Sequence, residues 1–137
     1  NNRTISSRLV DNVVKKIISK NELRKNKIKI NIETNIPVGY GLKSSSAIST
    51  SVALACSKIF KPKMSDLDIL LTSVNASIET KVSLTGAYDD ACACYYGGFN
   101  VTDNYKRKII LRKMDLKIIK FFILVVFSKF LILFQKK

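Results

Sequence analysis

The stretch P-V-G-Y-G-L-K-S-S-S-A, residues 37–47, decides the fold of this chain. Its two glycines, two positions apart, let the backbone adopt positive φ angles and approach a ligand closely. The apolar pattern of the next residues, Ile48 to Phe60, indicates a helix. A glycine-rich turn that leads into a helix presents unpaired N–H groups and the positive end of the helix dipole. The stretch therefore suits a phosphate group.

From its residues alone this loop has two interpretations. It is not a Walker A loop, because that motif places Gly directly before the Lys, where this chain has Leu42. The first interpretation is a phosphate-binding loop. The second is an ordinary joint between a strand and a helix, with Ser44 as the N-cap residue. The loop by itself does not decide between them.

Upstream of the loop, two periodicities follow one another. Apolar residues recur at helical spacing from Arg3 to Asn21, with lysines on the opposite face, and the polar residues 21–26 close this helix. From Lys27 to Ile36, isoleucines alternate with polar residues, which predicts a half-buried strand. Pro37 ends that strand because proline cannot donate to a ladder.

Downstream, Ser65 is the expected N-cap of a further helix. Its buried stripe is expected to consist of Leu67, Leu70, Leu71, Val74 and Ile78. Glu79 falls near the C-terminal end of this helix, where the dipole disfavours a carboxylate. Glu79 is therefore either an exposed residue with a small cost or a metal ligand.

The segment T-G-A-Y-D-D, residues 85–90, reads as a turn with two adjacent acids. By themselves Asp89 and Asp90 could be an N-cap and its neighbour. Residues 95–102 and 108–112 are typical of two strands joined by a turn, which predicts a hairpin.

The tail from Ile118 to Phe134 is mostly apolar. It is at the lower limit of length for a membrane helix and contains Lys120 and Lys129. A buried strand is favoured over a membrane span.

Composition limits the function classes. The 137 residues fit one domain, and the net charge of +14 comes mostly from scattered lysines. Because aromatic residues do not alternate with these lysines, we expect no nucleic-acid partner, whereas anionic substrates are favoured. The chain has no His, which excludes Ser–His and Cys–His nucleophiles. We expect its three cysteines to pack as small apolar residues in a reducing cytoplasm.

Taken together, these segments resemble the GHMP kinase superfamily. The loop matches every fixed position of the superfamily motif P-x-G-x-G-L-x-S-S-[AS]. Lys43 before three serines, and T-G-A-Y-D-D-A-C-A-C-Y-Y-G-G at residues 85–98, are most similar to the archaeal-type shikimate kinases. The resemblance covers roughly Arg3 to Lys117, and the tail 118–137 departs from it, which divides the chain at that point.

The resemblance implies a partial, GHMP-kinase-like two-layer α+β fold and an ATP-dependent kinase. Asp90 would be the catalytic residue, with Asp89 as the competing choice, and Mg²⁺ would be held by Ser45 and Glu79. The spacing between Glu79 and Asp90 is also that of the family. The implied phosphate loop comprises Pro37, Gly39, Gly41, Leu42, Lys43, Ser44, Ser45, Ser46 and Ala47.

The expected reaction is ATP-dependent phosphorylation of shikimate to shikimate 3-phosphate, in aromatic amino-acid biosynthesis. The alternatives are another GHMP small-molecule kinase, of the homoserine or mevalonate type, and a non-catalytic, membrane-associated remnant. The superfamily's first motif would lie upstream of Asn1, and its Gly-rich third motif has no counterpart here. We therefore expect a fragment of a cytoplasmic kinase, and the sequence indicates no oligomeric state.

Overall fold

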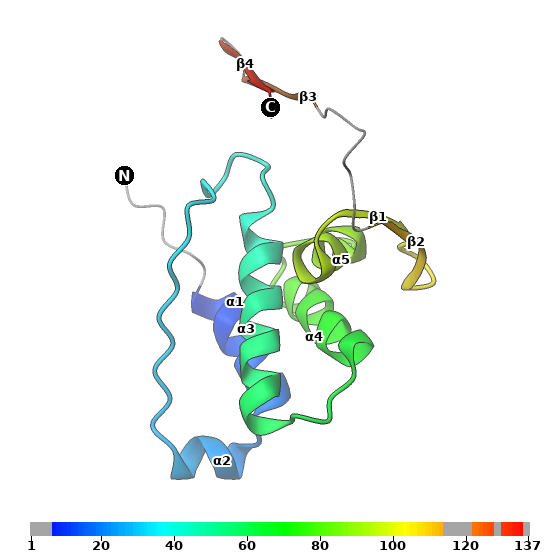
Figure 1. Cartoon of the computed structure of the whole chain (residues 1–137). Coiled ribbons are helices and arrows are strands. Elements are labelled where there is room, and N and C mark those ends of the chain that lie inside the picture. The colour runs from blue at the N-terminus through cyan, green and yellow to red at the C-terminus, as the bar shows by residue number, and fades with distance from the viewer. Residues whose placement is uncertain (1–6, 114–121, 128–129, 136–137) are drawn as a thin grey trace.

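The computed structural model describes residues 7–113 and, as backbone only, residues 122–127 and 130–135. Five helices precede four strands in these residues (Figure 1). The helices are α1 (Ser7–Ile17), α2 (Lys20–Lys25), α3 (Ser44–Phe60), α4 (Asp66–Glu79) and α5 (Tyr88–Tyr96). The strands are β1 (Phe99–Asp103), β2 (Lys108–Lys113), β3 (Phe122–Phe127) and β4 (Phe130–Gln135). This mixture of helix and antiparallel strand agrees with the α+β class.

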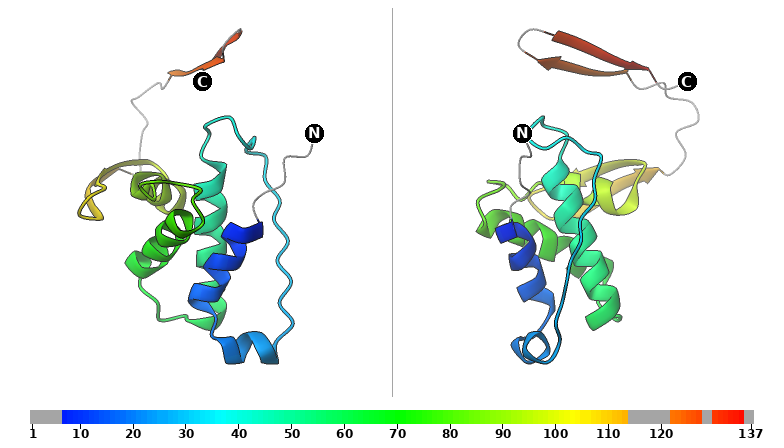
Figure 2. Two further views of the ribbon diagram at one scale, coloured as in Figure 1. Left: turned by 180° about the vertical axis from the view of Figure 1, so that it is seen from behind. Right: turned by 90° about the vertical axis from the view of Figure 1, so that its left-hand side faces the viewer.

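Helix α3, which begins at the end of the glycine loop, lies at the centre and contacts α1, α4 and α5 (Figures 1 and 2). Its many small residues allow this, because they let neighbouring backbones approach from several sides. Ala53 and Ser49 of α3 are completely buried. The position of the loop is therefore set by the packing of three other helices.

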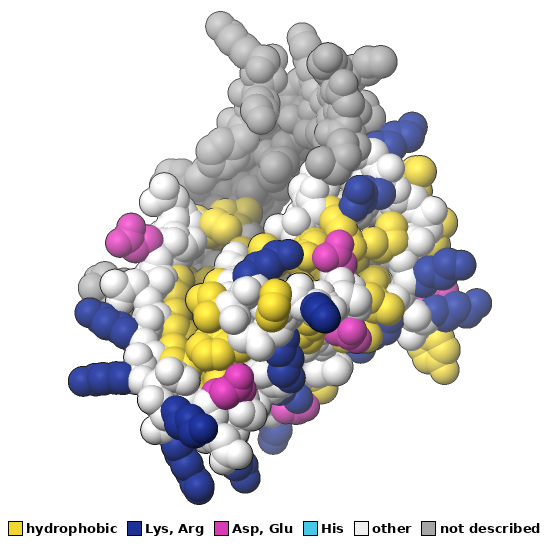
Figure 3. All heavy atoms as spheres, turned by 60° about the horizontal axis from the view of Figure 1, so that its bottom comes forward, with side chains coloured by type: hydrophobic (Ala, Val, Ile, Leu, Met, Phe, Trp, Pro, Cys, Tyr) yellow, Lys and Arg dark blue, Asp and Glu magenta, His cyan; other side chains and the backbone are white. Residues whose placement is uncertain are grey.

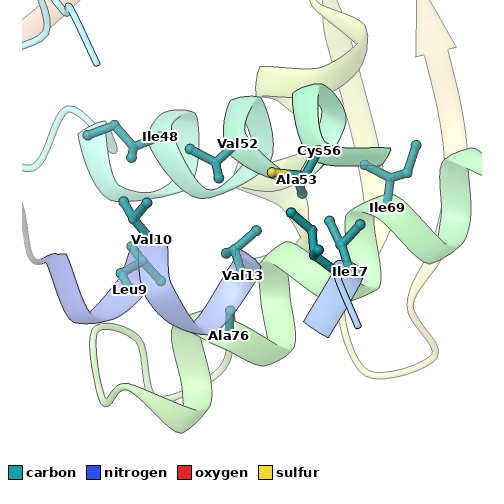
Figure 4. Packing of buried hydrophobic residues seen from close by; sticks show 11 residues of the cluster. Leu9, Val10, Val13, Ile17, Ile48, Val52, Ala53, Cys56, Ile69 and Ala76 are labelled. Atoms are coloured by element: carbon teal, nitrogen blue, oxygen red, sulfur yellow. The ribbon is translucent and has the colours of Figure 1, made fainter. Parts of the chain in front are cut away.

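The main core forms where α1 crosses α3 and α4 (Figure 4). Val13 and Ile17 of α1 are fully buried there. They pack in one cluster with Val52 of α3 and Ala76 of α4. Burying an aliphatic side chain of this size contributes about 1.5–3 kcal/mol. The amphipathic pattern predicted for the first helix is confirmed.

The predicted end of the first helix is wrong. Helix α1 ends at Ile17, and the polar residues read as its end form the separate short helix α2. A capping box starts α2: the Glu22 N–H donates to the Ser19 hydroxyl, and the Ser19 N–H donates to the Glu22 carboxylate. The two helices are distinct because this local pair satisfies the N–H groups of a new helix start.

The predicted strand at residues 27–36 does not form within the described residues. The segment is extended and runs beside α3 (Figure 2), but no described strand pairs with it. Alternation of apolar and polar residues predicts a strand only where a ladder partner exists. Instead, Ile28 and Ile32 line a groove of about 510 Å³ against Val52 and Cys56 of α3.

Helix α4 has its predicted N-cap but a broader buried surface than expected. The Ser65 hydroxyl accepts from the Asp68 N–H. Leu70 and Val74 pack toward α5, and Ile69 packs toward α1 and α3. Two residues of the predicted stripe, Leu67 and Ile78, are exposed instead. Because α4 contacts helices on two sides, a single stripe of large apolar residues does not describe it.

The hairpin after α5 is confirmed, with β1 and β2 antiparallel and a bulge between Val101 and Thr102. Tyr95 and Tyr96 belong to α5 rather than to the strand. The tail forms a second antiparallel hairpin, β3–β4, which agrees with strand rather than membrane helix. Across residues 7–113, 122–127 and 130–135, no helix has the length and apolar content to cross a membrane.

On the face that Figure 3 shows, basic side chains are spread out rather than gathered in one patch. Figure 3 shows Lys and Arg around much of the outline of the visible face, with Asp and Glu between them. This distribution agrees with the scattered lysines of the sequence. Cys56 and Cys92 are buried as expected, whereas Cys94 is exposed.

Candidate phosphate site at the start of α3

The loop before α3 has the backbone that its glycines predict. Gly39 and Gly41 have φ angles of 84° and 75°. The N-cap of α3 is Lys43, itself left-handed at φ 59°, and no side chain caps the helix. The interpretation of Ser44 as the N-cap is therefore wrong. Ser44 is the first residue of the helix and is buried.

Among the residues that the structure describes, the first N–H groups of this helix find no partner. The first helical bond runs from the Ala47 N–H to the Lys43 carbonyl, at 3.1 Å. Within the described residues, no hydrogen bond takes up the N–H groups of Ser44, Ser45 or Ser46. Unpaired N–H groups at the positive end of a helix dipole form an anion site. The geometry favours a phosphate loop over a simple joint.

The side chain of Lys43 connects this loop with α5. Its ammonium lies 3.0 Å from the Asp90 carboxylate, which is only 16 % exposed, whereas Lys43 itself is 61 % exposed. Hydrogen bonding to Asp90 raises the pKa of Lys43, and the charge of Asp89 adds to this at longer range. Two of the residues singled out in the sequence are thus brought together from separate segments.

The start of α5 is fixed by protein contacts. A Cβ placed on Gly86, which has a φ of 80°, would come 2.5 Å from Val74 of α4. The N-cap of α5 is Ala87, at φ 47° and without a cap of its own. Instead, the Asp89 N–H donates to the side chain of Asn104 in the β1–β2 turn, at 3.0 Å. These contacts hold Asp90 toward Lys43, while Asp89 is exposed.

Glu79 has a different partner. Its carboxylate accepts from the Lys16 ammonium of α1 at 2.5 Å, and this bond lowers the pKa of Glu79. The Lys43 ammonium pairs with Asp90, whereas Glu79 pairs with Lys16. The structure therefore does not bring Glu79 into the Lys43–Asp90 pair. No cluster of three or more His, Cys, Asp or Glu suited to a metal occurs in the residues that the structure describes.

The sequence comparisons identify the family. The profile of the GHMP kinases N terminal domain matches residues 8–98, which include the loop, Glu79 and Asp90. The chain belongs to the GHMP kinase family through this N-terminal domain. No solved structure gives a significant match.

The curated relatives that match this chain include several archaeal shikimate kinases. Shikimate kinase of Pyrococcus abyssi is 42% identical over 86 residues, which cover 63% of this chain and 31% of the relative. Shikimate kinase of Methanothermobacter thermautotrophicus is 43% identical over 91 residues, 63% of this chain and 32% of the relative. Shikimate kinase of Methanobrevibacter smithii is 43% identical over 86 residues, which cover 59% of this chain and 30% of the relative. This chain thus spans about a third of the length of these relatives.

Proposed function

We propose that this chain is part of an ATP-dependent kinase that converts shikimate to shikimate 3-phosphate in the cytoplasm. The observation that carries the proposal is the Lys43–Asp90 pair beside the open N-terminus of α3. A helix start suited to phosphate and a carboxylate that could orient an attacking hydroxyl lie near each other there, and phosphoryl transfer to an alcohol needs both groups. The similarity to curated shikimate kinases supports the choice of substrate.

The proposed ATP site is the loop Pro37 to Ala47, with the N–H groups of residues 44–46 directed at the phosphates. Lys43 would neutralise charge that spreads over the transferred phosphoryl group. Because its ammonium reaches Asp90, it also fixes where that carboxylate lies. Asp90 would orient the shikimate hydroxyl and accept its proton, a role that contributes about 10²–10⁴-fold. Asp89 is the alternative base.

The Ser45 hydroxyl and the Glu79 carboxylate are the residues that would hold Mg²⁺ together with the nucleotide phosphates. This donor set suits Mg²⁺, which takes one or two protein oxygens together with phosphates and waters. Glu79 is half exposed, and a surface pair such as Lys16–Glu79 is worth only about 0–1 kcal/mol. Exchange of Lys16 for the ion is therefore inexpensive. The bound ion would neutralise phosphate charge.

The proposal is tested by grafting, because the segment that matches this chain is only about a third of each relative. Residues 8–98 would replace the matching segment of the Pyrococcus abyssi relative, and ADP release would be measured with shikimate, homoserine and mevalonate. We expect turnover with shikimate alone. A folded graft that binds ATP but does not phosphorylate shikimate would contradict the proposal. The unaltered relative is the control for the assay.

A further inference from the structure

Three buried hydroxyl groups join α3 to α4 close to the first turn of α3, which belongs to the proposed phosphate site. They belong to Ser49 and Thr50 of α3 and to Ser73 of α4, all at most 2 % exposed. The Ser73 hydroxyl oxygen lies 2.8 Å from that of Ser49 and 3.0 Å from that of Thr50. These bonds run between helices, so they fix the position of one helix against the other.

The direction of these bonds follows from counting protons. Ser49 donates to the carbonyl of Ser46, at 3.2 Å. Because a hydroxyl has one proton to donate, Ser49 must accept from Ser73, and Ser73 must then accept from Thr50. The three groups form a one-way chain, from Thr50 through Ser73 and Ser49 to the Ser46 carbonyl. Every donor in this hydroxyl chain is used.

The hydroxyl chain ends in the turn that would bind phosphate. Ser46 belongs to the first turn of α3, which the bond from the Ala47 N–H to the Lys43 carbonyl closes. This turn has no side-chain cap of its own. The link from α4 reaches this turn through Ser49, whose hydroxyl donates to the Ser46 carbonyl, and it restrains the turn without pairing its N–H groups.

We propose that Ser73 is a positioning residue for the phosphate loop, acting through Ser49 on the first turn of α3. The hydroxyl chain holds this turn on α4, so that the N–H groups of residues 44–46 are in place before a nucleotide binds. It also holds Lys43 where it reaches Asp90. The inference rests on the proposed function for the ligand, but the restraint on the turn can be measured without one.

The chain offers a matched control in Ser57, also of α3 and 1 % exposed. Its hydroxyl donates to the Leu54 carbonyl within the same helix, at 2.8 Å. Ser57→Ala thus removes a buried hydroxyl and one bond, but no link between helices. Ser73→Ala breaks the link and leaves the Thr50 donor without an acceptor. Thr50→Val removes that stranded donor and should partly restore a Ser73→Ala protein.

The first experiment measures amide hydrogen exchange by NMR on the whole 137-residue chain, without nucleotide. We expect Ser73→Ala to speed exchange of the Ala47 and Ile48 amides about tenfold relative to Ser57→Ala. Adding Thr50→Val should recover part of that difference. Equal exchange in the Ser73→Ala and Ser57→Ala proteins, or no recovery, would overturn the inference.

The second experiment measures ATP affinity of the same variants by calorimetry. Ser73→Ala should weaken ATP binding about tenfold, and Ser57→Ala should not change it measurably. If the parent chain binds no ATP, the proposed function fails for this chain while the exchange result still decides the restraint. If Ser73→Ala alters exchange but leaves ATP affinity unchanged, Ser73 stabilises the helix pair only, and the positioning role is wrong.

Discussion

Helices α3 and α5 begin in the same unusual way but differ in what their first N–H groups contact. Each follows a glycine with positive φ, each has a left-handed N-cap residue, and neither has a side-chain cap from that residue. At α5 the protein supplies the missing partner, because Asn104 accepts from Asp89. At α3 the N–H groups of residues 44–46 have no partner in the described chain.

The glycines that precede the two helices also differ in how closely other residues surround them. Gly86, before α5, is packed against Val74 and Ile78 of α4. A Cβ added to Gly41, before α3, would meet no atom of the described residues within 4 Å. The start of α5 is packed against α4 and has its Asp89 N–H capped by Asn104. Within the described residues, the start of α3 has neither feature, and it suits an anion. Lys43 joins the two, since it is the N-cap of α3 and pairs with α5.

The largest effect is expected on kcat and from Asp90, which lies in the first turn of α5. In the grafted kinase, Asp90→Asn should lower kcat about 10²-fold or more with little change in ATP affinity. Asp89→Asn is the matched control, because its side chain is exposed and its backbone N–H remains capped. Steady-state kinetics would measure both variants. If Asp89→Asn lowers kcat and Asp90→Asn does not, the catalytic base is Asp89 and the assignment to Asp90 is wrong.

The two glycines allow the packed and the open helix starts to be compared directly. Gly86→Ala adds left-handed strain and forces a Cβ against Val74, which together should cost about 2–5 kcal/mol. Gly41→Ala adds the strain alone, about 1–2 kcal/mol. Urea unfolding followed by circular dichroism would give both values. Equal losses would mean that the space around the two turns does not differ as described.

Removing the distant cap of α5 should have a smaller effect. Asn104→Ala leaves the Asp89 N–H unpaired and should cost about 0.5–2 kcal/mol of stability. Asn100→Ala, in the same hairpin, removes a side-chain bond to the Gly97 carbonyl at the other end of α5 and serves as the control. Thermal unfolding would measure both. If the Lys43–Asp90 pair depends on the cap, Asn104→Ala should also lower the pKa of Lys43 toward its ordinary value.

The smallest effect is expected at Glu79. Its pKa is lowered in the folded protein, so the pair with Lys16 stabilises the fold above the ordinary pKa of Glu. That contribution is lost as the pH falls through the lowered pKa. Glu79→Gln should therefore cost at most about 1 kcal/mol at pH 7 and nothing at strongly acid pH. Lys16→Met should lower the stability with the same pH dependence. A loss of stability that does not depend on pH would contradict a stabilising Lys16–Glu79 ion pair.

Sequence patterns were sufficient where a feature depends on neighbouring residues. The positive φ angles of Gly39 and Gly41, the Ser65 cap and the β1–β2 hairpin were all predicted from local residues. The resemblance also singled out Lys43 and Asp90, which the structure places in contact. Their roles in binding and catalysis remain predictions.

What the sequence could not show depends on contacts between distant segments. Asn104 looked like an ordinary turn residue, and nothing local indicates that it caps α5. Ser73 stood within an apolar helix pattern, and its bonds to α3 appear only when the helices pack. The strand predicted at residues 27–36 is absent from the described structure because no described strand pairs with it. Local alternation of apolar and polar residues does not reveal whether such a partner exists.

The most direct test of the central claim is an NMR titration of the backbone amides with ATP, with and without Mg²⁺. The account predicts saturable shifts that are largest at the amides of Gly41 and residues 44–46, with the Asp89 amide little changed. Sodium chloride at equal ionic strength controls for unspecific charge effects. Equal responses at the starts of α3 and α5, or no saturable response at residues 44–46, would contradict the claim that α3 carries the open phosphate site.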